Sequence, residues 1–254
     1  MKILILGASN SNRPPSKCWP EYVADYFCNI KIRNAAFRGC TTEHLYDCYM
    51  ANEPFNPDLI LCDIPPWYRS HIPVSLKTQE VKIDKVHQTN NYEYVDYKLM
   101  RGVVPIGGYI ADNNNLLYSD WLKNQIMPGR KISLHSVLQS RAADRNRFDD
   151  LINLNHALCF SDYYKNKSIK DIQLLKYAIK DIPIYFIHTI GPVESLDVGN
   201  YLCENAYNYL DGTLCEDEWV HLSAAAHEKV SKELYIPAID NLLGNDFLGT
   251  ELHY

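Results

Sequence analysis

The amino-acid sequence predicts an α/β protein built on a parallel β-sheet. Three short apolar segments, residues 2–7, 30–37 and 57–64, each end at a glycine or within two residues of a glycine or proline, as buried parallel strands commonly do. Segments with apolar residues at helical spacing lie between them, so strands and helices alternate along the chain. This alternation predicts right-handed crossover connections and a sheet covered by helices.

The first quarter of the chain supplies most of this pattern. KILILG is the first strand and stops at Gly7, and SKCWPEYVADYFCN (16–29) carries apolar residues at helical spacing. IKIRNAAF (30–37) is the predicted second strand, and GCTTEHLYDCYM (39–50) is a glycine turn followed by a threonine-capped helix. PDLILCDI (57–64) is the third strand, introduced by proline.

Residues 64–114 carry the weakest pattern and are expected to form an insertion or a lid. PPWYRSHIP (65–73) is predicted to be a loop because of its prolines, and VKIDKVHQTNNYEYVDY (81–97) to be either a hairpin or part of a lid. Because no internal repeat or interdomain linker interrupts the chain, we expect one domain over residues 1–254.

The rest of the chain is predicted to be mainly helical. Residues 115–160 and 168–182 repeat apolar residues every three or four positions, which is typical of amphipathic helices. PIYFIHTIGP (183–192) is a further buried strand. A final helix is expected within residues 221–243, where Pro237 kinks or divides it.

Composition and charge restrict the class of protein. Hydrophobic residues make up 46% of the chain and charged residues 22%, as in globular domains with a proper core. A net charge of −6 argues against a nucleic-acid-binding surface, which needs clustered Lys and Arg. No segment approaches about 20 continuous apolar residues and no signal peptide precedes the first strand, so we expect no membrane span and a cytoplasmic location.

The cysteine and glycine patterns argue against metals and nucleotide cofactors. Eight cysteines form no C-x-x-C pair and several lie in apolar segments, so we expect buried thiols rather than zinc ligands or disulfides. His221 and His227 are six residues apart and do not share one helical face. No Walker glycine loop and no G-x-G-x-x-G occurs, so we expect no metal and no cofactor.

Ser9 is the first candidate for chemistry. It follows the first strand through Gly7 and Ala8, where a sharp turn can lift a hydroxyl above the sheet. Ser11 follows in the same loop. The alternative is that either serine caps a turn, a common role for this residue.

A serine nucleophile needs a base, and His221 is the strongest candidate for one. In CEDEWVHLSAAAHEKVSKEL, Glu218 lies three residues before His221 and Asp217 lies four residues before it. An acid this close can hydrogen-bond the imidazole and stabilise its charged form. The alternative is that the acids complement the dipole of the following helix and that the histidine is a surface residue.

Taken in order, these segments resemble the SGNH or GDSL hydrolases along nearly the whole chain. The family comprises serine esterases and acylhydrolases built on a flavodoxin-like three-layer α/β/α sandwich with a parallel sheet. LILGASNS resembles its first block, with Ser9 in the nucleophile position, and CWPEYVADYF resembles the helix that follows. IRNAAFRGCTTEHL resembles the second block, with Gly39 as the glycine whose N–H helps hold the oxyanion. EWVHLSAAAHEKVSKEL resembles the last block, with His221 as base and Glu218 where the family carries Asp.

The sequence departs from the family pattern at three places. Ala8 stands where the family often has Asp. Glu218 lies at the usual spacing of the triad acid but is not the usual residue, and Asp217 could take that role only if the loop shifted by one residue. The third block normally supplies an Asn that donates to the oxyanion, whereas CDIPPWYRSH contains none. Losing such a donor costs on the order of 10²–10³ in rate. The candidate substitutes are Asn10, Trp67 and Arg69.

The resemblance implies a serine esterase or deacetylase that hydrolyses a small-molecule or carbohydrate ester, with an O-acetylated sugar as the expected substrate. Trp67, Tyr68 and Arg69 are expected to line the acyl or sugar pocket, because aromatic faces suit sugars and a guanidinium suits polar oxygens. The alternative is a binding or structural protein without turnover, which the altered third block favours. The aromatic and arginine loop resembles divergent SGNH proteins of large phages, so this alternative includes a virion component.

Overall fold

The computed structural model describes eleven stretches of the chain. They are residues 1–8, 10–12, 17–37, 40–65, 70–73, 81–98, 103–106, 162–188, 196–203, 206–210 and 222–244. Within them, residues 70–73, 98, 103–106 and 207–208 are described by their backbone alone.

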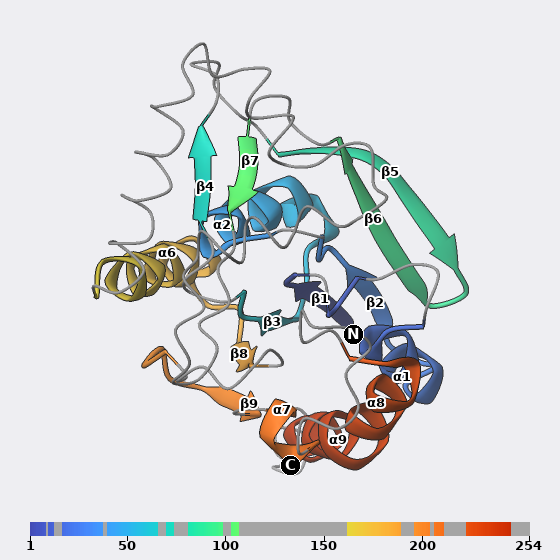
Figure 1. Cartoon of the computed structure of the whole chain (residues 1–254). Coiled ribbons are helices and arrows are strands. Elements are labelled where there is room, and N and C mark those ends of the chain that lie inside the picture. The colour runs from blue at the N-terminus through green and yellow to red at the C-terminus, as the bar shows by residue number, and fades with distance from the viewer. Residues whose placement is uncertain are drawn as a thin grey trace, which may run out of the picture.

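A seven-stranded, mostly parallel sheet forms the centre of the described structure (Figure 1). In spatial order its strands are β5 (Lys82–Thr89), β6 (Tyr92–Lys98), β2 (Lys31–Asn34), β1 (Lys2–Leu6), β3 (Leu59–Asp63), β8 (Ile184–Ile187) and β9 (Tyr201–Cys203). Neighbouring strands pair in parallel, except that β5 and β6 form an antiparallel hairpin. The predicted α/β chain with a mostly parallel sheet is therefore confirmed.

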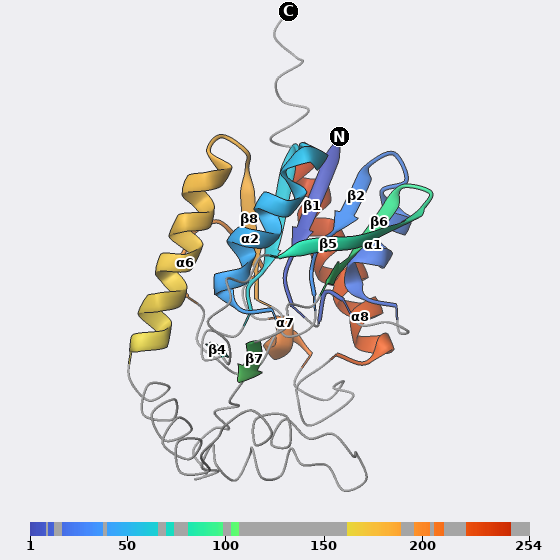
Figure 2. The same ribbon diagram turned by 90° about the horizontal axis from the view of Figure 1, so that it is seen from above.

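Helices cover both faces of this sheet. They are α1 (Trp19–Tyr26), α2 (Thr42–Asn52), α6 (Tyr163–Ile179), α7 (Ala206–Tyr209), α8 (Ala224–Val230) and α9 (Ile236–Leu242). Figure 2 shows α2 and α6 on one side of the sheet and α1 and α8 on the other, an arrangement compatible with a three-layer α/β fold. Within the described ranges, no helix is long and apolar enough to cross a membrane.

Strand β1 divides the core into two apolar clusters. Ile3 and Ile5 belong to the cluster beneath α1, α8 and α9, whereas Leu4 and Leu6 belong to the cluster beneath α2 and α6. All four side chains are fully buried. Side chains alternate between the faces of a strand, so a continuous apolar run such as ILIL fits a strand that is covered on both faces.

The order of the strands fixes where a ligand site belongs in this fold. From β1 the chain passes to β2 on one side and then to β3 on the other. In open α/β sheets, ligands bind beyond the carboxyl ends of the strands at such a reversal. The residues that follow β1, β2 and β3 therefore define the region of interest.

Residues 64–114 contain two antiparallel strand pairs. Residues 81–97 form the hairpin, and β6 pairs in parallel with β2, so the hairpin extends the central sheet. The loop prediction for residues 65–73 is wrong at its end, because Ser70–Pro73 forms β4 and pairs with β7 (Val103–Ile106). Proline is tolerated at a strand end, and four residues carry too little alternation to distinguish a strand from a loop.

Pro237 lies in the first turn of α9 without ending the helical stretch. Between α8 and α9 the chain forms a π-helical turn, Ser231–Tyr235. Proline lacks an N–H and clashes with the carbonyl four residues earlier, and a wider turn just before it relieves that conflict. The expected division is thus a change of helix type, and Tyr235 of this turn packs edge-on against Trp19, with ring centroids 5.1 Å apart.

Glu93 fastens the hairpin to the sheet. Its side chain is 4% exposed, and its two oxygens lie 2.6 Å from Lys31 Nζ and 2.6 Å from an Arg33 guanidinium nitrogen. Both cations belong to β2, so the ion pairs cross from β6 to its neighbour. The Arg33 guanidinium also lies over the ring of Phe55, 4.3 Å from its centroid.

We expect Glu93→Gln to lower the free energy of unfolding by about 2 kcal/mol at pH 7, because Arg33 loses its counterion while Lys31 stays partly solvated. Burial alone would raise the pKa of Glu93, but the hydrogen bonds and charges of Lys31 and Arg33 outweigh it and lower the pKa below 4.5. The carboxylate's contribution is therefore complete above pH 4.5 and is lost as pH falls through the lowered pKa. Urea unfolding between pH 7 and pH 3 checks this, and a difference between the two proteins that does not shrink in acid would contradict it.

Candidate active site

The chain turns sharply after β1. The Ser11 N–H donates to the Ala8 carbonyl at 3.1 Å and closes a four-residue turn over residues 8–11. Ala8, Asn10 and Ser11 are fully buried. Ser9, the predicted nucleophile, lies between Ala8 and Asn10 in the chain and falls outside the described residues.

Gly7 is required by the close approach of β3. A Cβ atom at this position would lie 2.9 Å from the Cβ of Asp63 and 3.1 Å from the Asp63 carbonyl oxygen. It would also lie 3.1 Å from Ser11 Oγ, inside the turn. The first apolar run ends at glycine because any larger side chain would collide with the neighbouring strand and with the turn.

We expect Gly7→Ala to lower the free energy of unfolding by about 2 kcal/mol, because either Asp63 or the turn must shift to admit the methyl group. Chemical denaturation measures the change. Gly244→Ala is a matched control, since no atom lies within 4 Å of a Cβ built there. Equal stability of the two variants would contradict the close approach at Gly7.

A buried polar cluster holds the turn in place. Ser11 Oγ donates to Asp63 Oδ2 at 2.5 Å and accepts from Trp19 Nε1 at 3.0 Å. The Ser11 carbonyl accepts from Asn34 Nδ2 at 2.6 Å. We call Ser11, Trp19, Asn34 and Asp63 the anchoring cluster; each of them is at most 2% exposed. They come from the turn itself, α1, β2 and β3, so the turn is tied to three elements at once.

The contacts of the anchoring cluster give Ser11 a structural role. The Ser11 hydroxyl proton is directed at a carboxylate, and no part of the residue is exposed. A substrate therefore has no access to Ser11, and its role is structural. At the edge of the cluster Asn34 Nδ2 also donates to the Tyr92 hydroxyl at 2.9 Å, and burial raises the pKa of that phenol, which stays neutral.

A second turn lies beside the first. The Cys40 N–H donates to the Phe37 carbonyl at 3.2 Å and closes it over residues 37–40. The Phe37 N–H donates in turn to the Gly7 carbonyl at 3.2 Å. Asn12 Nδ2 donates to the Ala36 carbonyl at 2.6 Å. Two cross-links thus join the turn after β1 to the segment after β2.

The segment before α8 reaches the first turn from the other end of the chain. The Leu222 N–H donates to Asn10 Oδ1 at 3.2 Å, across 212 residues of sequence. Ser223 then caps α8 by accepting from the Ala226 N–H at 3.1 Å. His221, the predicted base, directly precedes Leu222 and falls outside the described residues. The bond therefore joins the residue after Ser9 to the residue after His221.

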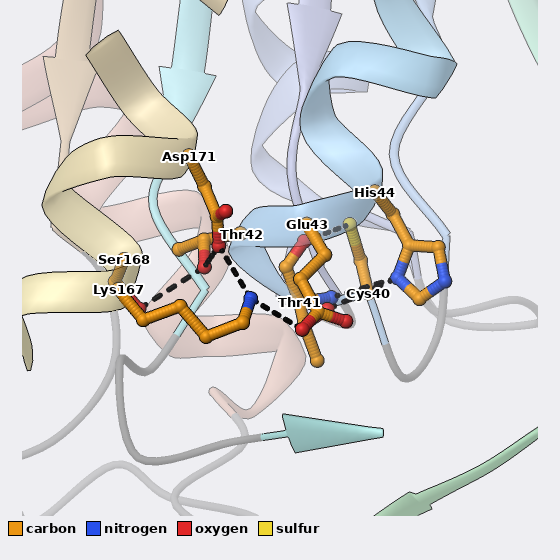
Figure 3. A network of polar contacts seen from close by, with 8 residues as sticks. All are labelled: Cys40, Thr41, Thr42, Glu43, His44, Lys167, Ser168 and Asp171. Carbon is orange, nitrogen blue, oxygen red and sulfur yellow. Dashed lines mark hydrogen bonds and ion pairs between the residues drawn. The ribbon is translucent and has the colours of Figure 1, made fainter. Parts of the chain in front are cut away.

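Helix α2, which follows the second turn, is held against α6 by polar and charged side chains (Figure 3). Thr42 Oγ1 lies 2.8 Å from Asp171 Oδ2 and 3.0 Å from Ser168 Oγ. A carboxylate can only accept, so Thr42 donates to Asp171 and Ser168 can donate to Thr42. Lys167 forms ion pairs with Asp171 and with Glu43. These contacts fix the start of α2 against α6.

His44 completes the start of α2. The Thr41 N–H and the Thr41 hydroxyl lie 3.4 Å and 3.1 Å from His44 Nδ1. An N–H can only donate, so Nδ1 is the acceptor and the ring proton is assigned to Nε2. The imidazole also packs edge-on against Phe37 of the second turn, with ring centroids 5.4 Å apart. His44 therefore has a capping role.

Most of the predicted site residues fall outside the part of the chain that the structure describes. They are Ser9, Gly39, Trp67, Tyr68, Arg69, Asp217, Glu218 and His221. Asn10 is described, and its Oδ1 is engaged by the Leu222 N–H. Among the residues described, no group of three His, Cys, Asp or Glu side chains could hold a metal ion.

Sequence reasoning missed the anchoring cluster. Asn34 and Asp63 are the last residues of β2 and β3. Polar residues that end apolar strands of a parallel sheet gather at one edge of that sheet, and this was the signal that could have identified them. No local signal marks Leu222 as the partner of Asn10.

The sequence comparisons assign no function to the site. No protein-family model matches the sequence, and no curated protein matches it significantly.

Proposed function

We propose that the protein is a serine ester hydrolase of the SGNH type, with Ser9 as nucleophile and His221 as base. The observation that carries the proposal is the meeting of three segments beyond the carboxyl end of β1: the turn over residues 8–11, the turn over residues 37–40, and Leu222. These segments are the ones that resemble the first, second and last blocks of the family.

The topology also supports this proposal. The order β2–β1–β3–β8–β9 is the flavodoxin-like order 2-1-3-4-5, with ligands expected at the reversal between β1 and β3. The hairpin of β5 and β6 is an addition at the β2 edge of that sheet. The SGNH family uses the same strand order, although many unrelated functions share it, so the site carries more weight than the fold.

In the proposed reaction, His221 removes the Ser9 proton as Ser9 Oγ attacks the ester carbonyl. The backbone N–H groups of Ser9 and Gly39 hold the negative oxygen of the tetrahedral intermediate. Glu218 orients the imidazole, with Asp217 as the alternative acid. The imidazolium then protonates the leaving alkoxide, which departs and leaves an acyl group on Ser9. His221 next deprotonates a water molecule that attacks this acyl group, and it returns the proton to Ser9 Oγ as the acid is released. The mechanism requires no metal or cofactor.

The surroundings of the two turns suit an oxyanion site. Backbone donors are most effective when they are fixed before charge develops on the substrate. Each turn is closed by its own backbone hydrogen bond, and two further bonds, from Phe37 to Gly7 and from Asn12 to Ala36, hold the turns together. Such a site would need little reorganisation during the reaction.

An O-acetylated carbohydrate is the substrate that we propose, following the family resemblance. Trp67, Tyr68 and Arg69 follow the end of β3 by four to six residues in the sequence, and β3 is parallel to β1, which precedes the turn over residues 8–11. Aromatic faces stack on sugars and a guanidinium binds polar oxygens, so these residues are suited to the sugar side of the pocket.

One observation favours a second function, that of a binding protein without turnover. The segment after β3 reads PPWYRSH and contains no Asn in the place of the family's third-block donor. A protein that has given up catalysis could keep the fold and bind the same kind of sugar, including as a component of a virion.

A fluorophosphonate probe separates the two functions. The probe reacts with activated serines, so we expect an adduct on Ser9, located by tandem mass spectrometry, together with hydrolysis of p-nitrophenyl acetate. Both signals should disappear in His221→Ala, because the serine then lacks its base. The absence of an adduct in folded wild-type protein would reject the hydrolase and favour the binding protein.

A further inference from the structure

Asn10 is fully buried and bridges two distant parts of the chain. Its Oδ1 accepts the Leu222 N–H at 3.2 Å, and Leu222 is 1% exposed. The bond is therefore shielded from water. In such surroundings a hydrogen bond is stronger, and the loss of one of its partners is costly.

Both ends of this bond are held independently of it. On one side, Asn10 lies in the turn that Ser11 fastens to three elements of the fold. On the other side, Leu222 precedes Ser223, the N-cap of α8, and its side chain packs in the apolar cluster beneath that helix. The hydrogen bond thus joins two parts of the fold that are each well fixed, the turn after β1 and the start of α8.

We propose that Asn10 is a positioning residue, which holds the start of α8 against the turn after β1 through the hydrogen bond from Leu222 N–H to Asn10 Oδ1. For its effect on catalysis this inference rests on the proposed function, because the residues next to this bond are Ser9 and His221. Since Asn10 is fully buried, the structure assigns it this role rather than that of a donor to the oxyanion.

Two substitutions separate the bond from the volume of the side chain. Asn10→Leu keeps the branching and the number of side-chain heavy atoms and removes the acceptor, whereas Asn10→Asp keeps an acceptor oxygen in either protonation state. Asn91→Leu is the matched control. Asn91 Nδ2 lies 2.9–3.1 Å from three backbone carbonyl oxygens. The backbone carbonyl of Asn91 accepts from the Ile32 N–H near the start of β2, at the end of the sheet opposite the turn after β1. Asn91→Leu therefore removes at least as many side-chain hydrogen bonds, at the other end of β2 from the turn.

Amide hydrogen exchange at Leu222, followed by NMR, measures the bond directly and does not depend on activity. We expect exchange at Leu222 to be about tenfold faster in Asn10→Leu, and to change by less than about twofold in Asn10→Asp and Asn91→Leu. In p-nitrophenyl acetate hydrolysis, Asn10→Leu should lower kcat by about tenfold or more with little change in KM, because misplacement of the base affects the transition state and not ground-state binding. Asn10→Asp should restore most of the turnover.

The outcomes separate this inference from the proposed function. Unchanged exchange at Leu222 in Asn10→Leu, or equal loss in Asn10→Asp and Asn10→Leu, would overturn the positioning role. An unchanged kcat in Asn10→Leu, beside faster exchange and an active wild-type protein, would overturn its link to catalysis. If exchange follows the expectation while the wild-type protein neither hydrolyses the ester nor takes the probe, the proposed function fails and the structural role of Asn10 stands.

Discussion

Ser9→Ala is expected to lower kcat/KM for p-nitrophenyl acetate by about 10⁴-fold while leaving the free energy of unfolding within about 0.5 kcal/mol of wild type. The substitution removes the attacking oxygen of the proposed mechanism. No other hydroxyl of the turn can replace it, because Ser11 is fully buried and its proton is directed at Asp63. Steady-state kinetics and urea unfolding of the same preparations provide both numbers.

Ser11→Ala is the matched control for Ser9→Ala, since it changes a serine of the same turn. It should lose about 2 kcal/mol of stability, because Trp19 Nε1 and Asp63 Oδ2 each lose a buried partner, and it should still take the fluorophosphonate at Ser9. The reverse pattern, with activity kept in Ser9→Ala and labelling lost in Ser11→Ala, would show that the nucleophile is misassigned.

Asp63→Ala is expected to lower the free energy of unfolding by about 3 kcal/mol, the largest stability effect that we predict. The carboxylate is fully buried at the end of β3, and its removal leaves the Ser11 hydroxyl without its acceptor and opens a cavity. Asp63→Asn keeps the volume and one acceptor oxygen, so it should lose about half as much. Urea unfolding of the two variants checks the ranking.

A double-mutant cycle tests whether Asp63 acts through Ser11. If the 2.5 Å hydrogen bond between them carries the effect, the losses in Asp63→Ala and Ser11→Ala should not add, and the coupling should amount to about 1–2 kcal/mol. Strict additivity would mean that Asp63 stabilises the fold by contacts unrelated to the turn.

The sequence predicts those parts of the fold whose signal is local. β1 and β3 are apolar runs buried on both faces, and their residues identify them without knowledge of any partner. β4, β7 and β9 have three or four residues each, which is too short for a pattern, and they are strands because of what they pair with. The pairing of the hairpin with β2 likewise depends on a distant contact, between Glu93 and Arg33.

Some residues of the candidate site can be identified from local patterns, and others cannot. Ser9 and His221 can be singled out because turn and acid-histidine patterns are local. The anchoring cluster cannot be singled out from the sequence. Asn34 and Asp63 have no distinctive local pattern, and only the folded sheet places them in contact with Ser11. The partner of Asn10 is 212 residues away, and no pattern of spacing encodes so distant a contact.

The bond between Asn10 and Leu222 also bears on the order in which parts of the proposed site form as the protein folds. Contacts between residues so far apart in sequence form only after a large loop has closed, which makes them slow to appear. The sheet strands β1 to β3 can assemble from the first 63 residues, but the start of α8 reaches the turn later. We therefore expect refolding chains to regain secondary structure before they regain the proposed esterase activity, so that this activity would report the completed fold.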